Sequence, residues 1–169
     1  MNCPGTALAR SFICLAIFLI LAAPVRADQL SGTVTWIYDG DTIRVTNVGK
    51  VRLLGIDAPE TEDSPRDAYY MRQRVSRKTL RKVAAQATDF NISHAKKKTV
   101  RLETAGEKQK DDYGRLLALV YLPDGRLLNR LLVENGLAAV YRRFDFNLKK
   151  DFLIAEKKAR KRGKGLWKK

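Results

Sequence analysis

Carboxylates and the arginine Arg52 gather in a strand-like stretch, WIYDGDTIRVTNVGKVRLLGIDAPET, at positions 36–61. Asp41 and Asp57 fall where predicted strands begin and end, and Glu60 follows a rigid Ala-Pro pair. Arg52 lies inside an apolar run. Carboxylate and carbonyl oxygens are the ligands that hard cations prefer, and a guanidinium holds a phosphate through two parallel donors. The stretch therefore predicts a metal and phosphate site.

Each of these residues also has an ordinary structural interpretation. Asp41 could be a turn residue, which is what we expect of Asp39 in the Asp-Gly turn. Arg52, and Arg115 after a Tyr-Gly turn, could face solvent instead of holding a phosphate. Glu60 could be a surface carboxylate or a general base that activates water. Together, however, two metal-binding acids, one base and two arginines match metal-assisted phosphodiester cleavage.

The residue inventory favours a hard cation. The chain has one histidine, and both cysteines, Cys3 and Cys14, fall in an N-terminal segment of different character. A mature chain without cysteine offers no disulfide and no thiolate metal site. We therefore expect Ca²⁺ before Zn²⁺.

That N-terminal segment has the pattern of a cleavable secretory signal. Arg10 precedes an apolar run at 11–23, and Val-Arg-Ala ends at Ala27. The run is too short for a membrane span, which needs about 20 apolar residues. We expect a signal peptide at 1–27 with cleavage near Ala27, and a secreted or periplasmic product without stable membrane association.

The charge of the chain points to a polyanionic partner. Its 169 residues carry a formal net charge of +15, with a pI near 10.1. Nucleic acid is the first candidate, and an anionic surface is the second. The length suits a single domain, at 28–169, and nothing in the sequence demands more than a monomer.

The elements that must position the site are short. In the first strand, Val34, Trp36 and Tyr38 alternate with Thr33, Thr35 and Ile37. Alternation predicts strands at 30–38, 42–46 and 98–104, and two further strands are expected after turns, at 51–56 and 116–121. Helical spacing predicts a long helix at 67–88, a short one at 127–132 closed by Gly136, and a last one capped by Asn147 and ended by Gly163. A brief extended piece is expected at 137–141. This order predicts a mainly β, α+β fold, a five-stranded OB-fold barrel with about three helices.

Several segments strongly resemble the staphylococcal nuclease, or thermonuclease, family. They are DGDT at 39–42, VRLLGIDAPE at 51–60, DYGRLLALVY at 112–121, NGLAAVY at 135–141 and GLW at 165–167, in the family's order. The likeness spans roughly residues 30–168. It implies an OB-fold and Ca²⁺-dependent hydrolysis of DNA and RNA, of low sequence specificity, with 3′-phosphorylated products. Single-stranded or frayed nucleic acid is the expected substrate.

By position, the resemblance also implies roles for single residues. Asp41 and Asp57 match the carboxylate ligands of calcium, and Ala58 matches the residue that lends a backbone carbonyl. Glu60 matches the proposed general base. Arg52 and Arg115 match the phosphate-binding arginines.

The substrate contacts match the family less closely. Tyr113 resembles a tyrosine that contacts the phosphate end of the substrate. Tyr141 is the candidate for the second substrate tyrosine, although residues 141–143 depart from the family's pattern. Asp112 stands where a basic substrate contact can occur, and Ala58 replaces a frequent threonine without loss of a carbonyl. The rival functions are a noncatalytic OB-fold module that binds nucleic acid and a basic protein acting on membranes.

Overall fold

The computed structural model describes residues 30–104 and 109–168, and the proposed signal at 1–27 lies outside them. No helix of the described residues is both long and apolar enough to cross a membrane. The elements follow one another in the order β1 (Leu30–Ile37), β2 (Thr42–Val45), β3 (Gly49–Leu53), β4 (Ile56–Asp57), α1 (Asp67–Met71), α2 (Arg77–Ala95), β5 (Thr99–Thr104), β6 (Leu116–Tyr121), α3 (Leu128–Glu134), β7 (Ala139–Val140), α4 (Lys149–Lys161) and the 3₁₀ turn η1 (Gly165–Trp167).

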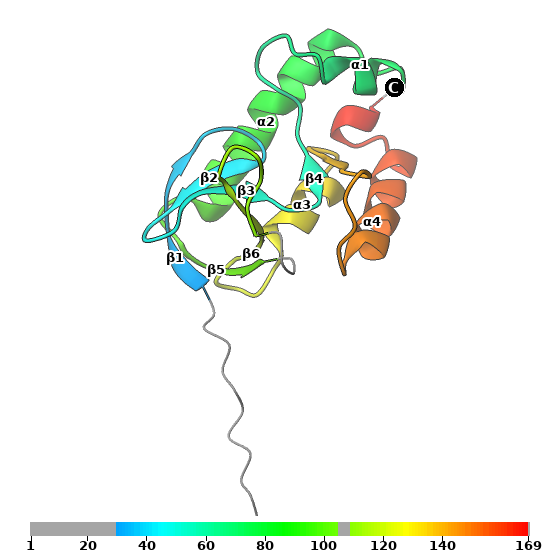
Figure 1. Cartoon of the computed structure of the whole chain (residues 1–169). Coiled ribbons are helices and arrows are strands. Elements are labelled where there is room, and N and C mark those ends of the chain that lie inside the picture. Colours follow the sequence, from blue (N-terminus) through cyan, green and yellow to red (C-terminus); the bar gives the residue numbers. More distant parts are fainter. Residues whose placement is uncertain (1–29, 105–108, 169) are drawn as a thin grey trace, which may run out of the picture.

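Five strands close into a barrel in the order β1-β2-β3-β6-β5. All neighbours are antiparallel except β3 and β6, which are parallel. This is the expected OB-fold of the α+β class. In Figure 1 the barrel occupies one side of the molecule and α4 the other, with α3 between them. Closure leaves the barrel with no free edge, so the short strands are all paired.

A buried asparagine fastens α3 to the barrel. The Asn129 side chain donates to the carbonyls of Leu54 (2.9 Å) and Ala118 (3.1 Å) and accepts from the Val120 amide (2.9 Å). These groups lie where β3 ends and β6 runs beside it. A fully satisfied buried amide of this kind specifies one arrangement of helix and strands. It holds the end of β3, and with it the start of the predicted site.

The predicted C-terminal end of the third strand is wrong. We expected one strand at 51–56, but β3 ends at Leu53, and Gly55 adopts φ +77°. The next two residues form β4, which pairs with β7 in a separate two-stranded sheet. Glycine tolerates this left-handed turn because it lacks a Cβ atom. The break turns Asp57 out of the barrel wall toward β7.

The long helix expected at 67–88 is also wrong. α1 ends at Met71, Arg74 has φ +65°, and a separate helix, α2, begins at Arg77. The Ser76 hydroxyl accepts from the Thr79 amide (3.1 Å), which provides the N-cap of α2. Met71, the last residue of α1, has an exposed side chain. The start of α4 differs too, because its cap residue is Leu148 rather than Asn147, without a side-chain cap.

The simple alternation expected in the first strand fails at one point. The register of β1 against β2 shifts between Val34 and Trp36, so that two successive residues point outward there. Val34 and Ile37 are buried in the barrel, while Trp36 and Tyr38 are 54% and 38% exposed. A β-bulge changes the face to which the following side chains belong. The two aromatic residues therefore lie on the outer face of the barrel.

Candidate active site

Asp41 and Asp57 converge on Arg52. Asp41 directly precedes β2, Arg52 pairs across the hairpin with Thr42, and Asp57 ends β4. The Arg52 guanidinium forms an ion pair with Asp41 through Nη1 and with Asp57 through Nη2, the latter at 2.9 Å. Burial alone would lower the pKa of Arg52, but the two carboxylates raise it above its usual value. The arginine is therefore held charged between the two acids.

Asp41 is almost completely buried and satisfied by its surroundings. Its Oδ2 accepts from the Ala58 amide (2.9 Å), and its Oδ1 accepts from the Thr42 hydroxyl (3.2 Å). Asp39 accepts from the Asp41 amide (2.8 Å), which is the turn geometry that we expected of Asp39. Ala58, the predicted carbonyl ligand, is thus adjacent to Asp41 although 17 residues separate them.

Asp57 has partners that sequence reasoning missed. The hydroxyl of Tyr70, a fully buried residue of α1, lies 2.7 Å from the Asp57 carbonyl and 3.1 Å from its Oδ2. Arg66 lies 3.3 Å from Asp57 Oδ1. Burial raises the pKa of Asp57 most, and the charge of Asp41 raises it further, against the effect of Arg52 and Arg66. No local pattern indicated Tyr70, because the break between α1 and α2 determines which way its ring faces.

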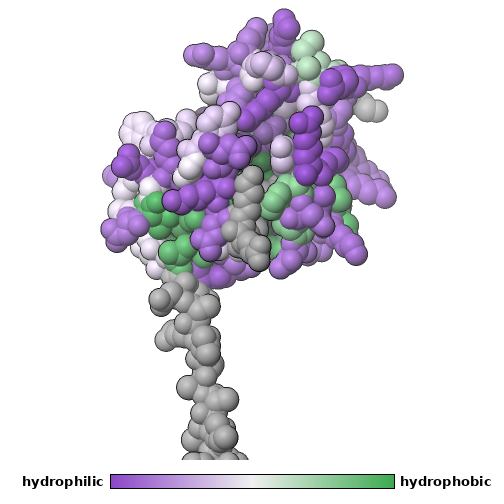
Figure 2. Space-filling view, viewed as in Figure 1, coloured by the Kyte–Doolittle hydropathy of each residue, from purple (hydrophilic) through white to green (hydrophobic). Residues whose placement is uncertain are grey.

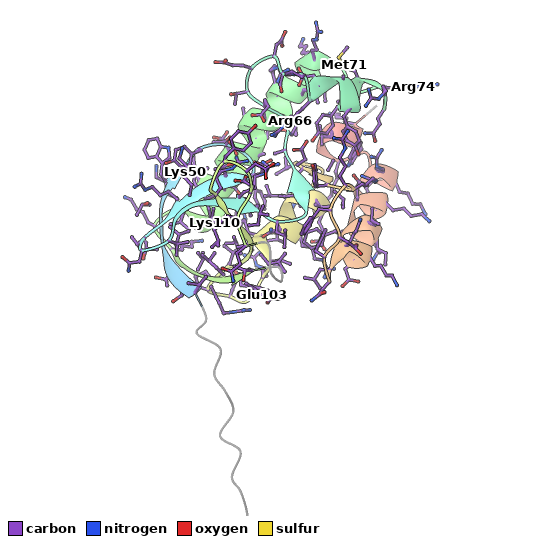
Figure 3. All side chains as sticks on the ribbon, in the orientation of Figure 1. Lys50, Arg66, Met71, Arg74, Glu103 and Lys110 are labelled. Atoms are coloured by element: carbon purple, nitrogen blue, oxygen red, sulfur yellow. The ribbon has the colours of Figure 1, made fainter. Side chains whose placement is uncertain are left out.

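Glu60 lies at the edge of the same cluster. Its Oε1 accepts from Arg66 (2.9 Å), and its side chain is 37% exposed. Burial raises the pKa of Glu60 most, followed by the charge of Asp41, while Arg66 opposes the shift. A carboxylate with a raised pKa and access to solvent suits a general base. Arg66, labelled in Figure 3 on the segment between β4 and α1, was not among the predicted residues.

Arg115 reaches the cluster from the start of β6. Its Nη1 lies 3.3 Å from the Thr42 hydroxyl, the group that also contacts Asp41. Asp111 fixes the arginine from behind, accepting from its Nε (2.7 Å) and its backbone amide (2.9 Å). We had considered Asp112 and missed Asp111. The sequence does contain a signal for Asp111, because it stands four residues before Arg115, on the other side of the Tyr-Gly turn. Gly114 in that turn has φ +75°.

A basic cavity of about 640 Å³ joins these groups to the predicted substrate tyrosines. Arg52, Asp57, Arg115, Tyr113 and Tyr141 all line it, whereas Asp41 and Glu60 do not. Tyr113 is 82% exposed and Tyr141 is 40% exposed. Further arginines complete the wall, namely Arg66, Arg72, Arg142 and Arg143. Hydrophilic side chains cover most of the face seen in Figure 2.

The carboxylates present suit a hard cation in kind. No group of three or more His, Cys, Asp or Glu side chains arranged to hold a metal is found within 30–104 and 109–168. Asp41 and Asp57 would therefore share the cation with backbone and water oxygens, which Ca²⁺ accepts readily. The charge of Asp41 raises the pKa of Asp57, and two carboxylates placed so close together fit a site for positive charge.

Comparison with known proteins identifies the family. A family model described as staphylococcal nuclease homologue matches residues 50–169. The chain belongs to the staphylococcal nuclease family. It is 34% identical over 161 residues to an uncharacterized endonuclease of Escherichia coli, covering 94% of this chain and 90% of that protein.

Two further relatives carry nuclease names. A thermonuclease of Staphylococcus hyicus is 33% identical over 147 residues, or 83% of this chain and 78% of the relative. A micrococcal nuclease of Shigella flexneri is 32% identical over 166 residues, or 92% and 83% respectively. The chain thus matches nucleases of the staphylococcal nuclease family over most of its length.

Proposed function

We propose that this chain is an exported Ca²⁺-dependent nuclease that hydrolyses DNA and RNA with low sequence specificity and leaves 3′-phosphorylated products. Its membership of the staphylococcal nuclease family supports the class of activity. The observation that carries the proposal is the bridge in which Arg52 joins Asp41 and Asp57, while Arg115 reaches the adjoining Thr42. Metal-binding acids and two guanidinium groups then surround one point.

The two arginines bind the phosphate in this proposal. Each guanidinium offers several N–H donors in a rigid plane, which matches the oxygens of a phosphodiester. Asp111 holds Nε of Arg115, so the terminal nitrogens of that arginine are directed toward Thr42 and the cavity. Fixed donors of this kind stabilise charge that develops on phosphoryl oxygens in the transition state.

Glu60 is the proposed general base. It takes a proton from the attacking water, which requires an ionised carboxylate with an affinity for protons above the usual value. Burial and the neighbouring acids provide that affinity, and Arg66 holds Oε1. Asp41, Asp57 and the Ala58 carbonyl are the proposed calcium ligands. When bound, the cation supplies positive charge that stabilises the phosphoryl oxygens.

Low specificity and a preference for single strands follow from the lining of the cavity. Six arginines and three tyrosines contribute to its wall, beside apolar residues and three aspartates. Arginine and tyrosine side chains contact phosphates and the flat faces of bases, which all nucleotides share. We propose that Tyr113 and Tyr141 stack against unpaired bases, and that duplex ends are cleaved where they fray.

Digestion assays test the proposal. We expect hydrolysis of single-stranded DNA and RNA with Ca²⁺, none with EGTA, and 3′-phosphate ends on the products. Glu60→Gln and Arg115→Ala should each lower kcat by roughly 10²–10⁴-fold, as loss of a general base or of a charge-stabilising donor does. Far-UV circular dichroism should show that both variants remain folded.

Matched controls are available in the chain. Glu62→Gln changes an exposed acid in the same loop, and Arg126→Ala changes an exposed arginine that pairs with Asp124. Both should cleave at the wild-type rate. Equal degradation with Ca²⁺ and with EGTA would contradict the metal dependence. Binding of DNA without any hydrolysis would favour a noncatalytic binding module.

Export is the remaining part of the proposal. We propose that residues 1–27 direct secretion to the periplasm or the medium and are cleaved near Ala27, and that the mature domain at 28–169 is a monomer. N-terminal sequencing of the exported protein should begin at Asp28. Retention of Met1 on the exported protein would contradict cleavage.

A further inference from the structure

Two aromatic side chains, Trp36 and Tyr38, stand on the outer face of the barrel. They are 54% and 38% exposed, although an unbroken alternation would put both on the face of buried Val34. The bulge between Val34 and Trp36 moves them outward. Bulges of this kind re-aim side chains and are common beside functional sites. Their exposure therefore follows from a specific feature of the backbone.

These aromatic residues share a face with the arginine of the candidate active site. The Tyr38 amide donates to the Thr42 carbonyl (2.9 Å), and Thr42 pairs with Arg52. Tyr38, which directly follows β1, thus lies in one row with Thr42 of β2 and Arg52 of β3. Because neighbouring strands lie about 4.8 Å apart, the row spans roughly 10 Å. The aromatic face begins two strands away from the proposed phosphate site.

A second row lies next to the first. Trp36 pairs with Arg44, and Arg44 pairs with Lys50. All three side chains are exposed, and Figure 3 labels Lys50 beside β2 and β3. Residues two apart on a strand lie roughly 7 Å from each other on the same face. The outer face of the barrel therefore runs from the largely buried Arg52, past buried Thr42, to the exposed residues Tyr38, Arg44, Lys50 and Trp36.

Each ring has its own cation. Lys50 Nζ lies 4.8 Å from the centroid of Tyr38, and Lys96 Nζ lies 5.1 Å from the centroid of Trp36. None of the ion pairs between described residues involves Arg44, Lys50 or Lys96. Their charges are thus available to an anionic ligand. Rings that can stack on bases, each with a cation for a phosphate, are the components of a surface for single-stranded nucleic acid.

We propose that this aromatic face (Trp36, Tyr38, Arg44, Lys50 and Lys96) binds the nucleotides that flank the phosphate held by Arg52 and Arg115. The rings stack on successive unpaired bases, and the cations contact the phosphates between them. The inference rests on the proposed function for the position of the cleaved phosphate. It adds a binding surface that extends from Arg52 of β3 across β2 to β1.

Tryptophan fluorescence tests the proposal directly. The chain has two tryptophans, and Trp167 is only 8% exposed, so a ligand on the aromatic face should alter the emission of Trp36. With EGTA present to prevent hydrolysis, we expect oligothymidylate of about 12 nucleotides to quench the emission, within the site sizes of such barrels. A thymidine dinucleotide should quench it much less. Trp36→Phe should abolish the change.

Affinity measurements provide a second readout. Trp36→Ala and Tyr38→Ala should each weaken binding of the labelled oligonucleotide by roughly 5- to 150-fold, the range for one base stacked on one ring. Cleavage of the dinucleotide, which is too short to reach the aromatic face, should keep its wild-type kcat/KM. Ile154→Ala, at an exposed apolar side chain of α4, should change neither quantity. Arg44→Gln with Lys50→Gln tests the same face without touching an aromatic ring.

The outcomes separate this inference from the proposed function. Unchanged affinity in the aromatic variants and in the Arg44/Lys50 double variant would overturn the aromatic face, even if the wild type cleaves DNA. Quenching by the long oligonucleotide without any hydrolysis would contradict the nuclease and leave the aromatic face standing. A shift of Trp36 emission with phosphatidylserine vesicles but not with oligonucleotide would replace nucleic acid by a membrane surface and overturn the inference.

Discussion

Asp39 shows how one residue can serve the turn and still oppose folding. Its carboxylate accepts from the Asp41 amide, and burial together with the Asp41 charge raises the pKa of Asp39 from 3.8 to about 6. Between those values the folded state keeps a proton that the unfolded state has released. The free energy of unfolding therefore falls as the pH rises through this interval.

Asp39→Asn should keep the acceptor and remove the charge. In buffer with EGTA we expect the variant to be more stable than wild type at pH 7 by about 1–3 kcal/mol, and to lose the decline between pH 4 and 6. Urea unfolding at several pH values measures this. Asp145→Asn, at a side chain that is 92% exposed, is the control and should follow the wild-type curve. Parallel curves for Asp39→Asn and wild type would show that the acid is not destabilising.

At the scale of elements, the break between β3 and β4 positions Asp57. A Cβ atom at Gly55 would collide with the ring of Phe146, in addition to the strain of φ +77°. The Gly55 carbonyl also accepts from the Tyr141 amide (2.9 Å), which joins the break to the cavity wall. Any side chain at position 55 would therefore destabilise the fold for two independent reasons, the collision with Phe146 and the backbone strain.

Gly55→Ala should lower the free energy of unfolding by about 2–4 kcal/mol, from overpacking and backbone strain together. Gly125 has a similar φ of +79° with nothing within 4 Å of a Cβ atom, so Gly125→Ala should lose only about 1 kcal/mol. Urea denaturation of both variants separates strain from collision. Equal losses would mean that Phe146 moves aside at little cost.

Across the whole molecule, Glu156 joins the last helix to the cavity. This side chain, 2% exposed on α4, forms ion pairs with Arg142 and Arg160, and its Oε1 accepts from the Val140 amide (3.3 Å). Arg142 lines the cavity, and Arg160 contacts Gln73 between α1 and α2. One buried charge thus links four parts of the chain.

Glu156→Gln should lower the free energy of unfolding by about 1–3 kcal/mol, because it leaves two arginines without their buried counter-charge. The estimate lies below the usual range for buried pairs because both arginines are partly exposed. Glu134→Gln, which breaks the exposed pair with Arg130, should cost at most about 0.5 kcal/mol. Thermal unfolding compares the two, and similar small losses would show that the buried network adds little.

Local patterns were sufficient for much of the fold. The alternation in 42–46 predicted β2, the turn before Leu116 predicted β6, and the spacing before Gly136 predicted α3. These predictions succeeded because side-chain period and turn residues act over a few neighbouring positions. The acids and arginines of the site were also recognisable as residue types. Their roles in catalysis remain proposals.

Long-range packing determined the rest. The spacing in 67–88 predicted one continuous helix. The structure instead buries Tyr70 against Asp57 and begins a second helix, α2, at Arg77 after the Ser76 cap, which one straight axis does not allow. No pattern in 30–38 marks the bulge, because it depends on pairing with β2. The sequence by itself thus determined which residues are available for chemistry. Only the closed barrel decided that Arg115 meets Thr42 from 73 positions away, and that Trp36 faces solvent, because strand pairing sets both distance and face.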